Sequence, residues 1–325
     1  MHHRIDSRVL GLFLALSWLQ IAGAVMGADR IRLAVPDVGG QFLTFPLAQN
    51  IGFLKQEGIE AEIVLIRGNA ALAAITGGDV DYTVGIPQGV RGALAGLPLK
   101  IVACFEPSST LLVLGSPKLK SLADLKGRTV AVGAVGGAPT RIARLLLQQA
   151  KINPDREINF LSAGAAQARV ALMKQGLADA AMVPPPFDVE GQKLGYVVLA
   201  RTHELLSFPQ SGLTVHVNRL RDKPDEIRRV IKAGIRANVF LRSNRDATVN
   251  FLSRWQRSTP DLARATYDSI QRVYNQDGSM PMDGLALVVR DTREALNISR
   301  DPPSGEFFDG TLLRRAQDEL GIKVK

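Results

Sequence analysis

The chain has 325 residues, which is enough for one large or two ordinary domains. Its 40 Lys and Arg against 31 Asp and Glu give a net charge of +9, and 46% hydrophobic with 22% charged residues is a globular composition, which excludes a disordered or collagen-like chain. A single cysteine, Cys104, excludes an internal disulfide and a cysteine-based zinc site, and four histidines leave little for a histidine metal cluster. We therefore expect neither a metal nor a cofactor.

The first residues predict an export signal. Arg4 and Arg8 precede a nearly uncharged run, Val9–Ala24, which ends in the small residues that signal peptidase recognises; a second cut follows Ala28. The run holds about fifteen apolar residues, whereas an uncleaved membrane anchor needs about 20. We expect residues 1–28 to be a cleaved signal peptide, without lipid attachment because no cysteine is near the cut. The mature protein is then expected in the periplasm.

The positive charge does not indicate a nucleic-acid partner. Its two densest stretches, Arg219–Arg229 and Arg242–Arg257, contain intervening acidic residues and fall on expected helices. The chain has no zinc-finger spacing and no interleaving of aromatic with basic residues. Solvated helix faces explain these charges, so we expect no nucleic acid to bind.

Short apolar strands alternate with helices over the first third of the chain. Strands are expected at Ile31–Val35, Glu60–Ile66, Tyr82–Gly85 and Lys100–Phe105. Helices are expected at Pro46–Gln56 with Thr44 as its cap, from Gly68-Asn69 to Gly77-Gly78, and at Pro87–Ala95. Strands separated by helices of this length predict right-handed crossovers and a parallel sheet.

The pattern then restarts and ends in a helical tail. Strands are expected at Leu111–Gly115, Thr129–Gly133, Ile158–Leu161, Ala180–Val183, Tyr196–Ala200 and Leu213–Val217. Helices among them are expected at Ser121–Gly127, a capped turn, and at Thr140–Ala150 and Ala165–Gln175. The tail is expected to form helices at Asp225–Leu241, Asp246–Gln256, Leu262–Tyr274, Asp283–Leu296 and Gly310–Leu320.

Two α/β units followed by helices predict two lobes. The strands around Leu111–Leu114 and Leu213–Val217 are candidates for a two-strand hinge. Lobe 1 is then discontinuous, with residues 29–110 and 212–325, and lobe 2 consists of residues 111–211. Because ligands bind outside the carboxyl ends of the strands in open parallel sheets, the site is predicted in the cleft between the lobes.

Glycine-containing loops that follow strands provide the binding candidates. Each loop leads into a helix N-terminus, where free N–H groups and the helix dipole favour anions. Such glycines can equally be turn residues, and none of these loops matches a dinucleotide fingerprint or a phosphate loop. The predicted ligand-binding residues are Gln41, Phe42, Thr44, Gly68, Asn69, Ile86, Pro87, Gln88, Ser108, Val135, Gly136, Gly137, Thr140, Pro185 and Phe187.

Catalytic candidates are weak. Ser108 has no histidine nearby in sequence, and no G-x-S-x-G elbow is present. Asp79 and Asp81 are typical of a polar edge before a strand, and Cys104 lies in an apolar strand, where it is expected to be a small buried hydrophobe. We expect no catalytic residues. Arg67 flanks one loop, either as a bidentate clamp on a carboxylate or sulfonate or as a solvated surface residue.

Several stretches resemble a known family, the nitrate/sulfonate/taurine-type (NitT/TauT) substrate-binding proteins of ABC importers, which is related to thiamine-pyrimidine synthesis and binding proteins. They are FPLAQNIGFLKQEGIEAEIV, ALAAITGGDVDYTVG, GALAGLPLKIVA, SLADLKGRTVAVGAVGG and KPDEIRRVIKAGIRA, and the resemblance extends over nearly all of Ile31–Lys325.

The resemblance implies an α/β chain with the type II periplasmic-binding-protein fold. It also implies capture of a small solute, anionic or heterocyclic, by a monomer that closes about its hinge and delivers the solute to an ABC permease in the inner membrane. Two alternatives stay open. One is an enzyme related to thiamine-pyrimidine synthesis, although the eukaryotic synthases carry a cysteine-rich iron motif and a sacrificial histidine, and this chain has one cysteine. The other is a ligand-sensing module for a membrane partner.

Overall fold

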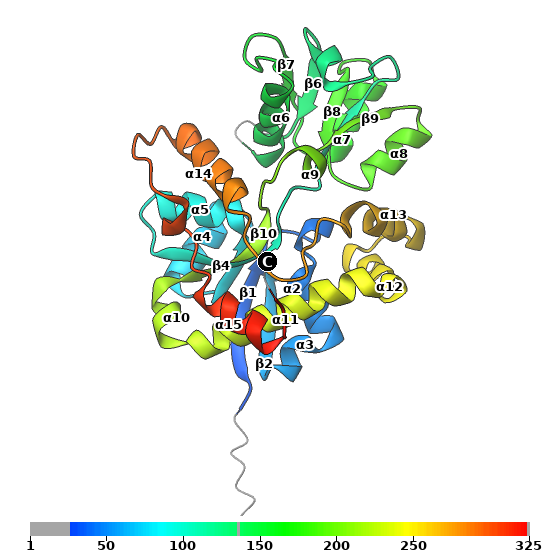
Figure 1. Ribbon diagram of the computed structural model, residues 1–325. Helices are drawn as coiled ribbons and strands as arrows, with labels where there is room; N and C mark the ends of the chain where they lie inside the picture. Colours follow the sequence, from blue (N-terminus) through cyan, green and yellow to red (C-terminus); the bar gives the residue numbers. More distant parts are fainter. Residues whose placement is uncertain (1–26, 135–136, 324–325) are drawn as a thin grey trace, which may run out of the picture.

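The computed structural model describes residues 27–134 and 137–323, and these form two α/β lobes, one above the other in Figure 1. Nearly all of the predicted signal peptide therefore lies outside the described residues, as do the predicted contacts Val135 and Gly136. Within the described residues, no helix is long and apolar enough to span a bilayer.

The first lobe is built on a sheet whose described strands have the order β2-β1-β3-β10-β4. Their bounds are β1 Asp29–Val35, β2 Ile59–Leu65, β3 Tyr82–Gly85, β4 Leu99–Glu106 and β10 Ser211–His216. β1 pairs in parallel with β2 and β3, whereas β10 is antiparallel to both of its neighbours, β3 and β4. The four strands predicted to be parallel, β1 to β4, therefore run in the same direction, and β10, which enters this sheet from the other lobe, runs in the opposite direction.

The second lobe repeats this plan with the described strand order β7-β6-β8-β5-β9. The bounds are β5 Leu112–Gly115, β6 Thr129–Val132, β7 Asn159–Ser162, β8 Ala180–Val183 and β9 Val197–Arg201. β6 is parallel to β7 and β8, and β5 is antiparallel to β8 and β9. Each lobe thus contains one strand that runs against the rest, and that strand lies next to a crossing between the lobes.

Helices cover both sheets (Figure 1). The helices up to β10 are α2 Thr44–Ile51, α3 Phe53–Gln56, α4 Gly68–Gly77, α5 Ile86–Leu94, α6 Ala138–Gln149, α7 Ala166–Lys174, α8 Phe187–Lys193 and α9 Thr202–Leu205, with short 3-10 turns η1 Gly40–Phe42 and η2 Leu122–Leu125. Those after it are α10 Val217–Asp222, α11 Pro224–Ser243, α12 Arg245–Gln256, α13 Pro260–Ile270, α14 Met282–Leu296, η3 Ser304–Glu306 and α15 Thr311–Glu319. Five of these short elements were not predicted from the sequence: η1, α8, α9, α10 and η3.

Two local expectations about the first long helix were wrong. The helix predicted at Pro46–Gln56 is split into α2 and α3 at Gly52, which takes the left-handed conformation (φ 86°) that ends helices and that glycine adopts without steric cost. Thr44 does not cap α2, because it is already inside the helix and its hydroxyl donates instead to Asn238 Oδ1 at 2.8 Å.

The chain passes between the lobes twice, in segments 107–111 and 202–210. The strands predicted to cross, β5 and β10, each lie within one sheet, and the crossings precede them. The two segments run side by side: the Ser108 hydroxyl donates to Leu206 O at 2.5 Å, and Thr202 N–H donates to Leu111 O at 3.0 Å. The path of the chain through these two segments supports the predicted lobe boundaries, which stay a prediction.

The helical tail belongs to the first lobe but also contacts the second. α11 crosses one face of the first sheet, where Gly234 leaves room for the Phe105 ring; a Cβ there would lie 2.5 Å from Phe105 Cζ. On one side of the crossing, Nε of Arg141 in α6 lies 3.2 Å from a carboxylate oxygen of Asp291 in α14. On the other side, α8 lies above α13 (Figure 1), and the hydroxyl of Ser269 donates to Asp188 at 3.0 Å.

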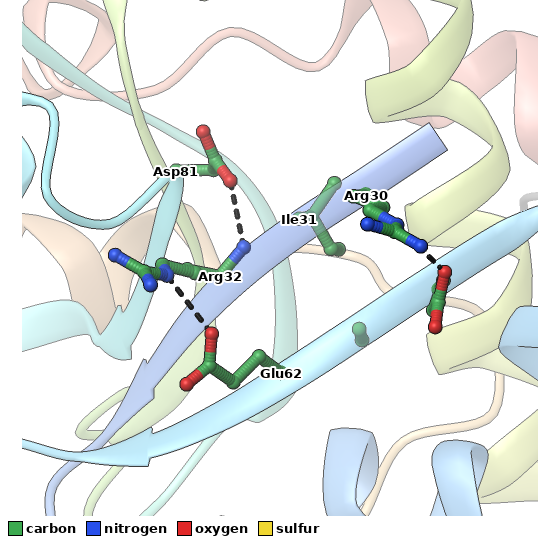
Figure 2. Close-up of a pocket in the computed structure, with 7 residues that line it drawn as sticks. Arg30, Ile31, Arg32, Glu62 and Asp81 are labelled. Carbon is green, nitrogen blue, oxygen red and sulfur yellow. Dashed lines mark hydrogen bonds and ion pairs between the residues drawn. The ribbon is translucent and has the colours of Figure 1, made fainter. Parts of the chain in front are cut away.

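A surface hollow along β1 and β2 is lined by paired charges (Figure 2). Arg30 pairs with Glu60 at 3.0 Å and Arg32 with Glu62 at 2.9 Å, while the Asp81 carboxylate accepts the Arg32 backbone N–H at 2.6 Å. These exposed pairs satisfy one another across neighbouring strands and do not define a binding site. Asp81 has a structural role here, consistent with the polar edge expected before β3.

Candidate functional site

A cavity of about 350 Å³ lies where the carboxyl ends of strands from both sheets meet. Its lining comes from loops after β1, β2, β3, β4, β6 and β8, from the start of α7, and from the two crossings. The lining residues are Pro36, Asp37, Gln41, Phe42, Arg67, Gly68, Pro87, Gln88, Ser109, Thr110, Leu111, Ala138, Pro139, Arg169, Pro184 and Gln210. Both lobes therefore contribute to the lining of one cavity.

Five of the predicted ligand contacts line this cavity: Gln41, Phe42, Gly68, Pro87 and Gln88. They follow three different strands of the first sheet, as the rule for open α/β sheets requires. Four prolines and Phe42 make much of the surface rigid and apolar, and few lining groups carry charge. Such a surface is typical of sites for small organic molecules, which combine apolar walls with a few placed polar groups.

The other described candidates lie near the cavity but not on its wall. Thr44 is held by Asn238, Ile86 is in the core and Asn69 is exposed on α4. Ser108 ties the two crossings together, and Gly137 precedes the first turn of α6. The Thr140 hydroxyl donates to Ala134 O at 2.9 Å. Pro185 is half-buried, and Phe187 begins α8 and packs against the core of the second lobe. Their role as ligand contacts stays a prediction.

Three charged side chains line the cavity, and two of them, Asp37 and Arg169, were not predicted from the sequence. Asp37 accepts the Gly39 N–H at 2.7 Å, and Arg67 is exposed with its Nε donating to Pro36 O at 2.9 Å. Arg169, near the start of α7, is only 4% exposed. Its burial lowers the pKa of the guanidinium, which nevertheless stays protonated at neutral pH. One clue was present in the sequence: the expected helix Ala165–Gln175 contains no acidic residue that could pair with Arg169.

A buried carboxyl group lies behind the first crossing. Glu106 ends β4 and is 0% exposed, and neither of its carboxyl oxygens has a hydrogen-bond partner among the described residues. Burial, with a smaller contribution from the charge of Asp37, raises the pKa of Glu106 well above its ordinary value. Its backbone carbonyl accepts the N–H of Gln210, a cavity residue, at 3.0 Å. Glu106 therefore keeps its proton to a higher pH than a solvated glutamate does.

The nucleophile candidates do not form a catalytic set in the described structure. Cys104 is fully buried in β4, and burial raises the pKa of its thiol well above the ordinary value. Ser109 reaches the cavity, but its hydroxyl oxygen accepts the Leu111 N–H at 3.2 Å, and no histidine lines the described cavity wall. A general base next to a serine or cysteine is what nucleophilic catalysis requires.

Two five-stranded α/β lobes, each with one antiparallel strand and joined by two crossings beside a shared cavity, define the type II periplasmic-binding-protein fold. Solved structures with this architecture match the chain. The periplasmic aliphatic sulphonate binding protein SsuA from Escherichia coli matches with a TM-score of 0.73 and 18% identity, over 86% of this chain and 92% of that one. The periplasmic nitrate-binding protein NrtA from Synechocystis PCC 6803 matches with 0.68 and 14%, over 90% and 89%.

The fold is not limited to binding proteins, since the desulfurization enzyme DSZB matches with a TM-score of 0.62 and 16% identity, over 90% of this chain and 99% of that one. The family is identified from the sequence. The model of the family described as "NMT1/THI5 like" matches residues 40–247, and the chain belongs to that family. The resemblance stated from the sequence is thereby confirmed. A comparison with curated proteins found no match.

Proposed function

We propose that this protein is a non-catalytic solute receptor of an ABC importer, which holds a small molecule between its lobes and delivers it to a permease. The observation that carries the proposal is the 350 Å³ cavity whose wall comes from both lobes and both crossings. A ligand that contacts both lobes favours the closed arrangement over the open one, so binding and closure are coupled. Export to the periplasm, cleavage of residues 1–28 and a monomeric state are parts of the same proposal.

The two contacts that flank the crossings support a closing motion. Arg141 with Asp291 and Ser269 with Asp188 join the lobes on opposite sides of the cavity through side chains only. Such contacts can break and re-form when the lobes rotate about segments 107–111 and 202–210. Closure then presents a surface that a permease can distinguish from that of the open form.

Solute binding is tested by a thermal-shift screen of sulfonates, nitrate, bicarbonate, aromatic carboxylates, pyrimidines and other heterocycles, followed by small-angle scattering on each hit. A ligand at 100 times its dissociation constant adds about 2.7 kcal/mol to the free energy of unfolding. We expect a hit to reduce the radius of gyration as well. The variant Ala138→Trp, which fills the cavity, is expected to abolish the shift, and the control Ala295→Trp, on the exposed face of α14, to retain it.

Binding that survives Ala138→Trp would show that the cavity is not the site. A hit without any compaction would contradict the closing mechanism. Chemical conversion of a hit, followed by mass spectrometry, would replace the receptor by an enzyme such as the related thiamine-pyrimidine synthases. If ligands bind and the lobes close, but a co-expressed permease takes up no ligand, the protein would instead be a ligand-sensing module for a membrane partner.

A further inference from the structure

Arg169 is a buried cation on the cavity wall that has no counter-charge among the described residues. It makes no ion pair within the described residues, and its Nε has no hydrogen-bond partner there. The guanidinium lies over Gly133 at the end of β6, where an added Cβ would approach Nη1 of Arg169 to 3.1 Å. The two residues that follow Ala134, Val135 and Gly136, carry no charge in their side chains. Within the described part of the chain, the positive charge of Arg169 is therefore not neutralised at this end of the cavity.

Other shielded arginines of the protein have carboxylate partners. Arg219 pairs with Glu226 at 2.7 Å, Arg201 with Asp188 at 2.9 Å and Arg229 with Asp29 at 2.5 Å. An unpaired charge is costly in a poorly solvated place, and proteins normally pair or hydrogen-bond a buried ion. Arg169 departs from this pattern on the wall of the cavity, where a solute from outside can supply the missing charge.

The rest of the cavity is poor in charge and rich in apolar surface. Phe42, Pro87, Leu111, Pro139 and Pro184 form walls without hydrogen-bond donors in their side chains. Arg67 is exposed to solvent at the rim, and Asp37 on the opposite loop carries the single negative charge of the described lining. The lining therefore has one positive charge in excess, and the buried one is Arg169.

We propose that Arg169 binds the acid group of an organic monoanion, a carboxylate or a sulfonate, whose apolar ring or chain lies against the proline-rich walls. This inference rests on the proposed function, since it names the class of solute that the receptor takes. The planar guanidinium donates two parallel N–H bonds to a carboxylate or sulfonate, a geometry that discriminates an acid from its neutral amide. A compact inorganic ion such as nitrate satisfies the charge but leaves the apolar walls uncovered.

Calorimetric titration of the purified protein with matched pairs of probes tests this assignment. The acids are benzoate, cyclohexanecarboxylate and benzenesulfonate, and the neutral counterparts are benzamide, cyclohexanecarboxamide and benzenesulfonamide. We expect the best acid to bind at least roughly 30-fold more tightly than its amide, and Arg169→Gln to weaken that acid by a similar factor, the scale seen when one partner of a buried charge pair is removed. Arg169→Lys should recover part of the loss. The control Arg156→Gln, which removes an exposed charge of the second lobe outside the cavity, should change affinity by less than about fivefold, because exposed charges contribute little.

The outcomes separate this inference from the receptor proposal. Affinity of Arg169→Gln for the acids within threefold of wild type overturns the role of Arg169 and leaves the receptor in place. Equal binding of acid and amide does the same. Binding of neutral heterocycles in the screen, with no acid bound at millimolar concentration, overturns the anionic class alone. Failure of every compound to bind or to compact the protein counts against both proposals. An unchanged or raised melting temperature of ligand-free Arg169→Gln verifies that the variant is folded.

Discussion

Arg219 in the first lobe and Arg169 in the second are both largely shielded from solvent, yet their surroundings differ. Arg219 contacts the carboxylates of Asp81 and Glu226, and its guanidinium lies 5.1 Å from the centre of the Tyr82 ring. Arg169 has no carboxylate partner in the described structure and borders the cavity. The charge of Arg219 is neutralised by carboxylates of the protein itself. The charge of Arg169 can instead be neutralised by a ligand in the cavity. The contrast separates charges that hold the protein together from charges that recognise a ligand.

The largest expected effect of this contrast is on stability in the first lobe. Arg219→Met leaves the buried Glu226 carboxylate, which also accepts the Tyr82 hydroxyl at 2.5 Å, without its cation. Removing one partner of a buried pair costs about 3–5 kcal/mol of unfolding free energy. Urea denaturation measures this loss. The exposed neighbour Arg221→Met is the control and should leave stability unchanged; equal losses in the two variants would show that the Arg219 cluster is not special.

A smaller effect is expected from Glu106, the buried carboxyl group that lacks a charged partner in the part of the chain that the structure describes. Because the folded protein raises the pKa of Glu106, its folded form holds a proton that the unfolded chain releases. Its contribution to stability is therefore complete below the ordinary pKa of a glutamate and is lost as the pH rises through the folded-state pKa. Burial also raises the pKa of Asp291, which therefore adds to the pH dependence of stability in the same direction. The contribution of Glu106 is isolated by comparing wild type with a variant that lacks only this carboxyl group.

Urea titrations between pH 5 and pH 9 measure this dependence. We expect the stability of Glu106→Gln to fall less with rising pH than that of wild type, because a glutamine cannot release the proton. Glu62→Gln, which removes an exposed carboxylate paired with Arg32, should retain the wild-type slope. Parallel curves for wild type and Glu106→Gln would mean that this carboxyl group is ionised in the folded protein.

The smallest expected effect is the most discriminating one. Arg169→Met removes a buried charge without leaving a partner behind, so we expect the ligand-free protein to lose no stability and to gain up to about 1 kcal/mol, as replacements of buried ions by apolar residues often do. Urea denaturation in the absence of solute measures the change. A loss comparable to that of Arg219→Met would make Arg169 a structural residue and would remove the contrast between the two lobes.

Most strands and helices could be predicted from the sequence because their signals are local. β3 and β8 match their predicted ranges, and α4 ends at the predicted glycine pair, since apolar runs and left-handed glycines act within a few residues. The direction of β10 could not be predicted in this way. It depends on which sheet the chain has left, and the alternation of strands and helices carries no such information.

The site was partly predictable for the same reason. Gln41, Gly68, Pro87 and Gln88 follow strands of the first sheet, and the topology brings the loops after such strands to one edge. Arg169 lies inside a helix, where an arginine ordinarily faces solvent, and its burial results from the packing of α7 against β6 and β8. Thr44 and Ser108 were placed near the cavity, but each is held by a distant partner, Asn238 and Leu206, that no local pattern reveals.

The position of β10 has a consequence for how the molecule is made. This strand lies between β3 and β4, so the first sheet lacks an interior member until residue 216 of the chain has been synthesised. The second lobe, by contrast, consists of a continuous stretch and can assemble as soon as β9 is complete. Domains generally fold as units, and non-local pairings form slowly. The lobe that begins the chain is therefore expected to mature last, around a neighbour that is already folded.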